Sequence, residues 1–396
     1  MLGPCVSARC QLLLKPKVPT CSAKLADMKT SGISVFRVAF SLAVLAVSGA
    51  LLVGCSGNKK PCSSPHAASP QFVGCGFQNP ANPDALPSQG TLKIWTRFFF
   101  AGKTGTVPVD PIPVRTVTAA QLAALDPAAN HVIRLGHSTS LLKLRGAYWL
   151  IDPMFSERAS PVQWFGPKRF QSPPIALDQL PPIAGLVLSH DHFDHLDATT
   201  IRYLAQRVQR FFVPLGVGAR LRDMDVPADR ITELDWWRGA ELDGVKLTAT
   251  PAHHFSGRGL FDRNETLWAS WVIQSGTQRL FYSGDGGYGP HFKAIGERFG
   301  SFDLALIENG AYDAYWPSVH LTPEQGAQAF LDLKAKVMLP VHNSTFDLAF
   351  HPWQEPLDRV ADVAQTRQID LATPLLGEVV TVGQARTNVR WWSGLR

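Results

Sequence analysis

The chain has no cysteine after residue 75, although it is 396 residues long. All six cysteines lie in its first part, at positions 5, 10, 21, 55, 62 and 75. The rest of the chain therefore holds no thiol that could form a disulfide or bind a metal. This excludes a disulfide-stapled scaffold and a cysteine-based zinc site there. Within the first part, Cys62 and Cys75 could pair in an oxidising compartment.

Excess positive charge is also scarce outside the N-terminal segment. The formal net charge of the whole chain is +6, but residues 1–54 hold six basic side chains and one acidic side chain, Asp27. Without this segment, 32 basic and 31 acidic side chains remain, which is a net charge of +1. Because nucleic-acid binding needs a concentrated basic surface, we expect no nucleic-acid partner.

The basic N-terminal segment has the pattern of an export signal. A short basic stretch, 28–37, precedes seventeen mostly apolar residues, 38–54. Seventeen residues are marginal for a membrane span and the chain beyond them is polar, so a cleaved signal is favoured over a retained transmembrane helix. Residues 1–27 have no role in this pattern, and we expect translation to start at Met28.

The end of the apolar run resembles a bacterial lipobox. Leu52-Val53-Gly54-Cys55 closes the run directly. The resemblance implies cleavage before Cys55 and attachment of lipid to this residue, which would anchor the protein to a membrane. Serine rather than aspartate at position 56 resembles proteins sorted to the outer membrane. We therefore expect an exported bacterial lipoprotein of the outer membrane, facing the periplasm.

Composition divides the remainder into a tether and one domain. Residues 55–90 are rich in Ser, Pro, Gly and Asn, which indicates a flexible tether. Residues 91–396 alternate short apolar runs with helical patterns and show no repeat, which predicts a single α/β domain of layered sheets and helices. Thr322 and Gln325 are placed to form a capping box on one helix. The expected strands are 132–135, 141–144, 148–151, 183–188, 246–250, 267–273, 279–282, 304–307 and 337–341, and the expected helices are 198–209, 322–334 and 354–365.

Residues 188–197, with the sequence LSHDHFDHLD, hold three histidines and three aspartates directly after an expected strand. A solvated loop has no need of His190, His192 and His195 together. Neutral imidazole and carboxylate are standard zinc donors, and a tight turn after a strand lets these histidines and Asp194 converge on a small volume. The segment therefore predicts a metal site.

Further candidate donors follow three later strands: His253-His254, Asp285 and His342. Each is a weak signal alone, because paired histidines are common on surfaces and the Ser-Gly-Asp that ends at Asp285 is usually a turn. Loops that each bring one donor to the same edge of a sheet are what a metal site on a rigid scaffold needs, so their order and spacing carry the inference. Ser283 has no nucleophile-elbow context, and no Ser-His-Asp arrangement is visible.

The order His-x-His-x-Asp-His, a later His, Ser-Gly-Asp and a final His resembles the metallo-β-lactamase superfamily, whose fold is an αββα sandwich. The resemblance covers roughly residues 95–385. Other short motifs resemble the branch that contains N-acyl-phosphatidylethanolamine-hydrolysing phospholipase D. These motifs are Gly136-His137-Ser138, Asp152-Pro153, the segments 251–258 and 267–271, and the stretch from Gly310 to His320.

The resemblance implies two zinc ions per chain and a complete set of ligands. It places His190, His192 and His254 on one zinc and Asp194, His195 and His342 on the other, with Asp285 bridging the two. His254 is preferred to His253 because it stands directly before Phe-Ser-Gly-Arg. His320 matches a substrate-side histidine of the phospholipase branch, and its alternative is an ordinary polar loop histidine. Asp152 is expected to support a histidine ligand from behind.

Three positions bear on the subtype. His192 stands where diiron electron-transfer members carry a glutamate, which favours a zinc hydrolase. Asp285 stands where antibiotic-hydrolysing β-lactamases typically carry a cysteine, so we expect no β-lactamase activity. Phe193 replaces the tyrosine of the phospholipase branch, and a hydroxyl that contacts the lipid is therefore missing.

The chemistry implied by this resemblance is hydrolysis by a hydroxide that bridges the two zinc ions. Asp285 and His320 are the expected catalytic residues. We expect a phosphodiesterase or phospholipase D-like enzyme that acts on a small-molecule or lipid phosphodiester. Two alternatives stay open: a lactone or other carboxylic-ester hydrolase with the same metals, and a surface lipoprotein whose metal site is structural or vestigial.

Overall fold

The computed structural model describes residues 64–79, 93, 96–97, 101–386 and 388–396. The expected export signal, the expected lipid attachment site at Cys55, and Cys62 lie outside the described residues, while Cys75 is exposed and carries a free thiol. None of the helices in the described part is long and apolar enough to cross a membrane.

The first half of the domain forms most of a seven-stranded mixed sheet with the order β15-β3-β4-β5-β6-β7-β8. Strands β3, β4 and β5 pair antiparallel, and β5 through β8 pair parallel. The bounds are β3 His131–Gly136, β4 Thr139–Leu144, β5 Ala147–Ile151, β6 Ile183–Val187, β7 Val208–Pro214, β8 Ile231–Leu234 and β15 Val379–Thr381.

The second half forms a six-stranded mixed sheet with the order β14-β13-β12-β11-β10-β9. Strands β9 to β12 pair antiparallel, and β12 to β14 pair parallel. The bounds are β9 Gly239–Leu242, β10 Val245–Thr250, β11 Ser270–Ser275, β12 Gln278–Tyr282, β13 Leu304–Glu308 and β14 Met338–Val341.

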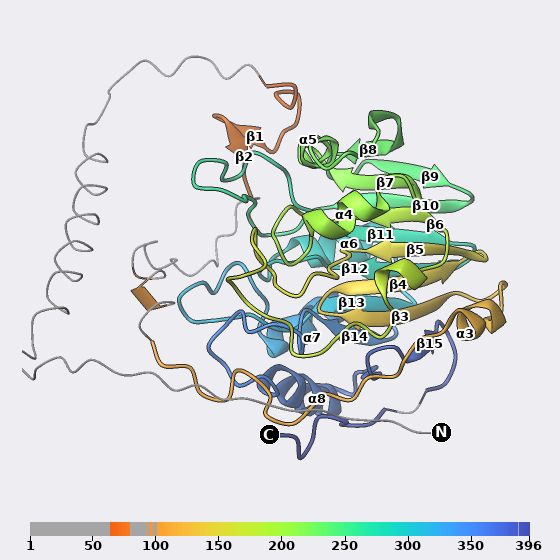
Figure 1. The fold of residues 1–396 in the computed structure, drawn as a ribbon, viewed down its shortest axis with the longest axis vertical. Helices are drawn as coiled ribbons and strands as arrows, with labels where there is room; N and C mark the ends of the chain where they lie inside the picture. Colours follow the sequence, from red (N-terminus) through yellow and green to blue (C-terminus); the bar gives the residue numbers. More distant parts are fainter. Residues whose placement is uncertain (1–63, 80–92, 94–95, 98–100, 387) are drawn as a thin grey trace, which may run out of the picture. The chain divides into compact units, whose positions relative to one another are not determined.

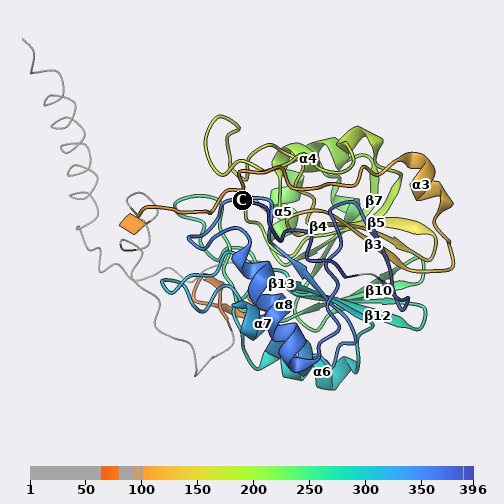
Figure 2. The ribbon, with the colours of Figure 1, turned by 90° about the horizontal axis from the view of Figure 1, so that it is seen from below.

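Three hydrophobic clusters hold the two sheets and the helices together in layers. The cluster between the sheets joins residues such as Trp149 to Trp271. A second packs the outer face of the seven-stranded sheet against α3 Ala119–Ala124, α4 Ala198–Leu204 and α5 Val217–Arg222. The third packs the outer face of the six-stranded sheet against α6 His291–Phe299, α7 Pro323–Asp332 and α8 Glu355–Arg367. Both sheets are thus covered on both faces, which is the expected αββα sandwich (Figure 2).

Every expected strand and helix is present, with differences at some ends. The expected helix 198–209 ends at Leu204 because its later residues enter β7, a strand that the sequence pattern missed together with β8, β9 and β15. The expected strand 267–273 begins only at Ser270, because the backbone of Leu267 bonds to Leu215 and that of Ala269 bonds to Ser189 in the other half of the domain. Thr322 and Gln325 form the predicted capping box on α7.

The described part of the expected tether differs from the prediction. Residues 64–79 form a small hairpin, β1 Phe72–Val73 and β2 Gly76–Phe77. Phe77 is fully buried in the cluster between the sheets, and its backbone N–H donates to the carbonyl of Asn264. A polar composition predicted a flexible segment, but burial of this aromatic side chain fixes the segment to the domain.

Strand direction brings several loops to one edge. Strands β3, β5 and β6 run in one direction within their sheet, and so do β10, β12, β13 and β14 in theirs. The carboxyl ends of these strands lie together, and the long loops that follow them gather on the left in Figure 1, opposite the short hairpin turns. This edge carries the histidine-rich segment.

Candidate metal centre

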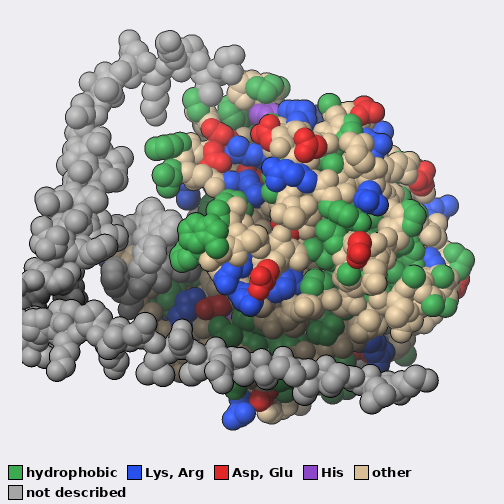
Figure 3. Space-filling view, in the orientation of Figure 1, with side chains coloured by type: hydrophobic (Ala, Val, Ile, Leu, Met, Phe, Trp, Pro, Cys, Tyr) green, Lys and Arg blue, Asp and Glu red, His purple; other side chains and the backbone are tan. Residues whose placement is uncertain are grey.

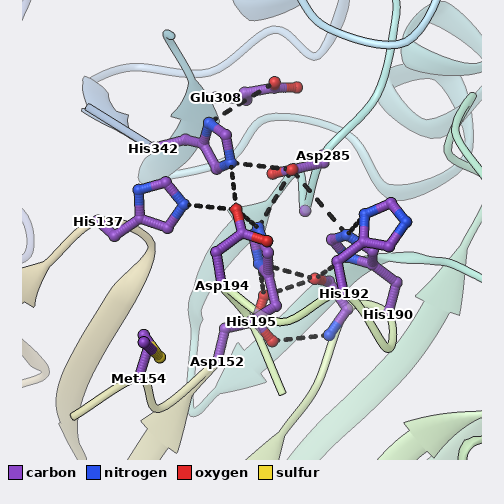
Figure 4. Close-up of polar contacts among 12 residues, drawn as sticks. His137, Asp152, Met154, His190, His192, Asp194, His195, Asp285, Glu308 and His342 are labelled. Atoms are coloured by element: carbon purple, nitrogen blue, oxygen red, sulfur yellow. Dashed lines mark hydrogen bonds and ion pairs between the residues drawn. The ribbon is translucent and has the colours of Figure 1, made fainter. Parts of the chain in front are cut away.

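The predicted donors converge at this edge from both sheets (Figure 4). We name residues 188–197, which follow β6, the ligand loop. His254 follows β10, Asp285 follows β12 and His342 follows β14. Gly284, in front of Asp285, has a positive φ of 59°, and a Cβ there would meet Ser189 of the ligand loop at 2.9 Å. The Ser-Gly-Asp turn therefore needs glycine for its backbone conformation and for this close approach.

One cluster consists of three histidines. The Nδ1 atom of His192 lies 2.9 Å from Nε2 of His190 and 3.2 Å from Nε2 of His254. His190 and His254 are 1% exposed. Three ring nitrogens from two loops thus face one point.

The second cluster consists of Asp194, His195 and His342. The Oδ2 atom of Asp194 lies 3.4 Å from Nε2 of His195 and 3.3 Å from Nε2 of His342. Asp285 Oδ2 lies between the clusters, at 3.1 Å from His195 Nε2, 2.9 Å from His342 Nε2 and 4.0 Å from Nε2 of His190 in the first cluster.

Hydrogen bonds behind the rings select the nitrogen that faces the clusters. Nδ1–H of His254 donates to the carbonyl of Val319 at 2.8 Å, and Nδ1–H of His195 donates to Asp152 at 2.6 Å. Nδ1 of His190 lies 2.9 Å from the Ser189 hydroxyl. With Nδ1 engaged in this way, each of these rings turns Nε2 toward the cluster, as histidine ligands of metals usually do.

The two clusters fit divalent metal ions such as zinc. Nitrogen and oxygen ligands about 2.0–2.1 Å from a tetrahedral ion are about 3.3 Å apart, close to the spacings within each cluster. Asp285 Oδ1 is buried and has no hydrogen-bond partner among the described residues, although a buried carboxylate oxygen normally has one. The donors are imidazoles and carboxylates, which are suitable zinc ligands.

Asp152 supports the centre from the seven-stranded sheet, as expected. It is fully buried at the end of β5 and accepts hydrogen bonds from the Ser189 backbone at 2.7 Å, the Ser189 hydroxyl at 2.5 Å and the Tyr282 hydroxyl at 2.5 Å, as well as from His195. This carboxylate therefore ties the ligand loop to β12 and orients one histidine.

The structure adds two residues whose role the sequence did not predict. His137 follows β3 and its Nε2 lies 2.9 Å from Oδ2 of Asp194, so it belongs to the second cluster. Glu308 ends β13, is buried, and bonds to His320 and to the backbone N–H of Gly286. His137 stood in the Gly-His-Ser motif without an assigned role, and Glu308 had no signal beyond an acidic residue at the end of an apolar run.

The structure separates the remaining candidate histidines. Nδ1 of His320 lies 4.0 Å from Oδ2 of Asp285, and its side chain is 15% exposed, so it lies beside the second cluster and is partly accessible to solvent. His253 is in none of the clusters, and its Nδ1–H instead donates to the carbonyl of Ser318 at 2.9 Å. His254, not His253, therefore faces the other donors.

Burial and charge set the protonation of the protein groups. Burial, together with neighbouring histidines, holds the pKa of His190 and of His254 well below the usual range, which favours the neutral imidazole that binds cations. Burial also lowers the pKa of His342, but Asp285 and other carboxylates outweigh it and raise the pKa to about 10. Burial and the charge of Asp285 hold the pKa of Glu308 well above the usual range.

The loop after His254 is fixed by polar contacts of Arg258 and Asp262. The carboxylate of Asp262 accepts from the backbone N–H of Arg258 and of Gly259. The guanidinium of Arg258 donates to the carbonyls of Asp191 and Leu196 in the ligand loop at 2.6 and 2.8 Å. These bonds connect the two loops that supply the three-histidine cluster.

Comparison with known proteins agrees with this geometry. The sequence model of the Beta-lactamase superfamily domain matches residues 148–343. An uncharacterized protein of Mycobacterium tuberculosis is 42% identical over 307 residues, which are 76% of this chain and 80% of that protein. The N-acyl-phosphatidylethanolamine-hydrolyzing phospholipase D 1 of Caenorhabditis elegans is 34% identical over 247 residues, 59% of this chain and 69% of that protein.

Two further similarities concern the fold and a shorter relative. The crystal structure of a possible metal-dependent hydrolase from Veillonella parvula superposes with a TM-score of 0.51 at 17% identity, over 64% of this chain and 99% of that one. The outer membrane protein RomA of Klebsiella pneumoniae is 54% identical over 100 residues, 25% of this chain and 75% of that protein.

The fold, the donor clusters and these similarities define the class of protein. The chain belongs to the metallo-β-lactamase superfamily and is a metal-dependent hydrolase. Within the superfamily it belongs to the branch of the N-acyl-phosphatidylethanolamine-hydrolysing phospholipase D proteins.

Proposed function

We propose that this protein is a zinc-dependent phosphodiesterase of phospholipase D type that holds two zinc ions. The observation that carries the proposal is the position of Asp285 Oδ2 between a three-histidine cluster and an Asp-His-His cluster. His190, His192 and His254 would hold one ion, Asp194, His195 and His342 the other, and Asp285 both.

Two zinc ions in these clusters would acidify a water molecule and polarise the phosphoryl oxygen. The protein residues supply the rest. Asp194 and Asp285 offset the positive charge of the centre, and Asp152 keeps His195 in one orientation. His320, held by Glu308 beside Asp285, is partly exposed and would hydrogen-bond to the phosphodiester or to its leaving oxygen. Hydrolysis would consume one water and yield a phosphomonoester and an alcohol.

The names of the relatives support a lipid phosphodiester as the substrate. Exposed hydrophobic residues near the centre support it too. Leu260 and Phe261 are 89% and 91% exposed on the loop that Arg258 ties to the ligand loop, and Trp164 is 81% exposed on another loop. Figure 3 shows hydrophobic side chains that project beside Lys and Arg at the edge where the long loops lie. Such surfaces suit contact with lipids.

A metal and substrate assay tests the proposal. The full chain, purified in detergent after expression with added zinc, should contain about two zinc equivalents by elemental analysis. It should hydrolyse a bis-aryl phosphodiester and release phosphatidic acid from phosphatidylethanolamine vesicles. A chelator should abolish both rates, and zinc should restore them.

Other outcomes would favour the alternatives. If the protein binds two zinc equivalents and hydrolyses lactones or carboxylic esters but not phosphodiesters, it is a lactone or carboxylic-ester hydrolase. Bound zinc without turnover of any of these compounds would indicate a structural site. A zinc content near zero would refute the two-metal proposal.

We also propose that the enzyme is an exported lipoprotein attached to the outer membrane through Cys55. The basic stretch, the apolar run and the Leu-Val-Gly-Cys sequence support the processing site. The similarity to an outer membrane protein of Klebsiella pneumoniae supports a place in the cell envelope.

A further inference from the structure

Residues 64–79, which precede the domain that the sequence delimits, reach the metal centre. The rings of His66, Phe72 and Phe77 pack on one another, with centroid distances of 5.1 Å for Phe72–Phe77 and 5.7 Å for His66–Phe77. Phe77 is fully buried as a member of the large hydrophobic cluster, and its backbone N–H donates to the Asn264 carbonyl at 2.8 Å. This anchor places Asn79, two residues later, against the loop that carries His254.

Asn79 forms hydrogen bonds with both backbone polar groups of His254. Its Oδ1 accepts from the His254 backbone N–H at 2.9 Å, and its Nδ2 donates to the His254 carbonyl at 2.7 Å. The same Oδ1 accepts from the indole N–H of Trp268 at 2.9 Å, and Trp268 is 1% exposed. The side-chain amide is thus itself held in one orientation while it pairs with the backbone of one residue.

These bonds set the position of His254 in two steps. The amide of Asn79 fixes the backbone of His254, and the carbonyl of Val319 accepts from its Nδ1–H at 2.8 Å and fixes the ring. With both fixed, Nε2 points at His192 Nδ1 at 3.2 Å. Metal sites need their ligands within about 0.5 Å of the productive geometry, so loss of one support would displace a ligand.

We propose that Asn79 is a positioning residue for the metal centre, and that residues 64–79 are part of the frame of the site rather than a tether. Asn79 acts through the backbone of His254. The inference rests on the proposed two-zinc function, because it concerns the three-histidine cluster to which His254 belongs. It goes beyond that function, since it assigns a role to a segment outside the predicted domain.

The test compares Asn79→Ala with Gln78→Ala, which removes a neighbouring amide side chain that does not bond to His254. Zinc affinity of each full-length variant is measured by competition with a chromophoric chelator. We expect one of the two zinc equivalents to bind about 10–100-fold more weakly in Asn79→Ala, as for other partners that orient metal ligands, while the second equivalent and the Gln78→Ala variant stay as in the wild type.

A second readout is independent of metal. Hydrogen exchange of the metal-free protein, followed by mass spectrometry, should be faster in Asn79→Ala for the peptide that contains His254, because its backbone N–H loses its acceptor. Asn79→Asp keeps an oxygen for this N–H but places an oxygen against the His254 carbonyl. Asn79→Asp should therefore weaken the binding of the same zinc equivalent as Asn79→Ala.

The outcomes separate this inference from the proposed function. If the wild type binds two zinc ions and either Asn79 variant, folded by circular dichroism, binds both with unchanged affinity, Asn79 has no positioning role. Equal weakening of both equivalents would also overturn it, because that result indicates a general loss of structure. If the wild type itself binds no zinc, the proposed function fails, while the hydrogen-exchange result still decides whether Asn79 fixes His254.

Discussion

At the scale of single residues, Asp285 is the group that lies close to both donor clusters. Its Oδ2 is within 3.1 Å of two histidines of one cluster and 4.0 Å from a histidine of the other, and the side chain is buried. Asp285→Asn keeps the size of the side chain but removes the negative charge that would offset the two proposed zinc ions. We expect the hydrolysis rate to fall by more than about 100-fold, beyond the usual effect of losing an outer partner of a metal ligand.

The fold should survive this substitution, since Asp285 does not contribute to the hydrophobic clusters. For one sample of the variant, circular dichroism measures the fold, elemental analysis measures the bound zinc, and a phosphodiesterase assay measures the rate. Retention of most turnover with two zinc ions bound would show that Asp285 does not bridge them.

The adjacent pair His253 and His254 gives a second test at this scale. Nε2 of His254 faces His192, whereas Nδ1 of His253 donates to the carbonyl of Ser318, outside the clusters. His254→Ala should therefore lose metal and activity, and His253→Ala should keep both metals and most turnover. Zinc content and rate of the two variants check the assignment, and the opposite ranking would move the ligand by one residue.

At the scale of secondary structure elements, helix α6 begins with a buried histidine outside the donor clusters. Burial, with a smaller contribution from His253, lowers the pKa of His291 from 6.5 to about 3. The unfolded chain thus binds one more proton than the folded protein between these values. The stability that depends on neutral His291 is present above pH 6.5 and is lost as the pH falls toward 3.

We expect the free energy of unfolding of the wild type to fall by about 2 kcal/mol between pH 7 and pH 5 because of this proton. The His291→Leu variant should lack this decrease. Denaturant unfolding of both proteins at the two pH values measures the difference, and an NMR titration of His291 gives its pKa directly. Identical pH dependence of the two proteins would mean that the pKa of His291 is the same in the folded and the unfolded state.

Some helices and strands were predicted from the sequence, whereas others were missed. Helix α7 was predicted together with its capping box because Thr322, Pro323 and Gln325 are local signals. Helix α6 was missed, since Pro290 provides no side-chain cap and the helix is only nine residues long. Strand β7 was missed, and the expected helix 198–209 ran into its first two residues, Val208 and Gln209.

At the scale of the whole molecule, the centre exists only because the two sheets pack face to face. The seven-stranded sheet brings the ligand loop, His137 and Asp152, and the six-stranded sheet brings His254, Asp285 and His342. Either sheet alone would present an incomplete set of donors. The large buried cluster between the sheets therefore determines the geometry of the site as well as stability.

Attachment to the envelope is a prediction for the whole chain. If the protein is cleaved before Cys55 and acylated there, intact-mass measurement of the membrane fraction should show a chain that begins at a lipid-modified Cys55. Cys55→Ser should block this maturation. A chain that starts at Met1 or Met28 without lipid would rule it out.

The sequence by itself determined the chemistry of the donors and their places along the chain. Histidines and aspartates after apolar strands mark a metal site, and the absence of cysteine after residue 75 excludes thiolate ligands from the rest of the chain. These signals are local, so they can be read without knowing how the strands pack.

Only the tertiary structure decided which atoms meet. The Nδ1 atom of His192 faces Nε2 of His190 and of His254. Nε2 of His137 contacts Oδ2 of Asp194, and Glu308 forms a hydrogen bond with His320. Asn79 reaches His254 across 175 positions of the chain, from a segment whose composition indicated a free tether. Such contacts leave no periodic or local trace in the sequence, because they depend on the packing of two sheets and on the burial of Phe77 in the large hydrophobic cluster.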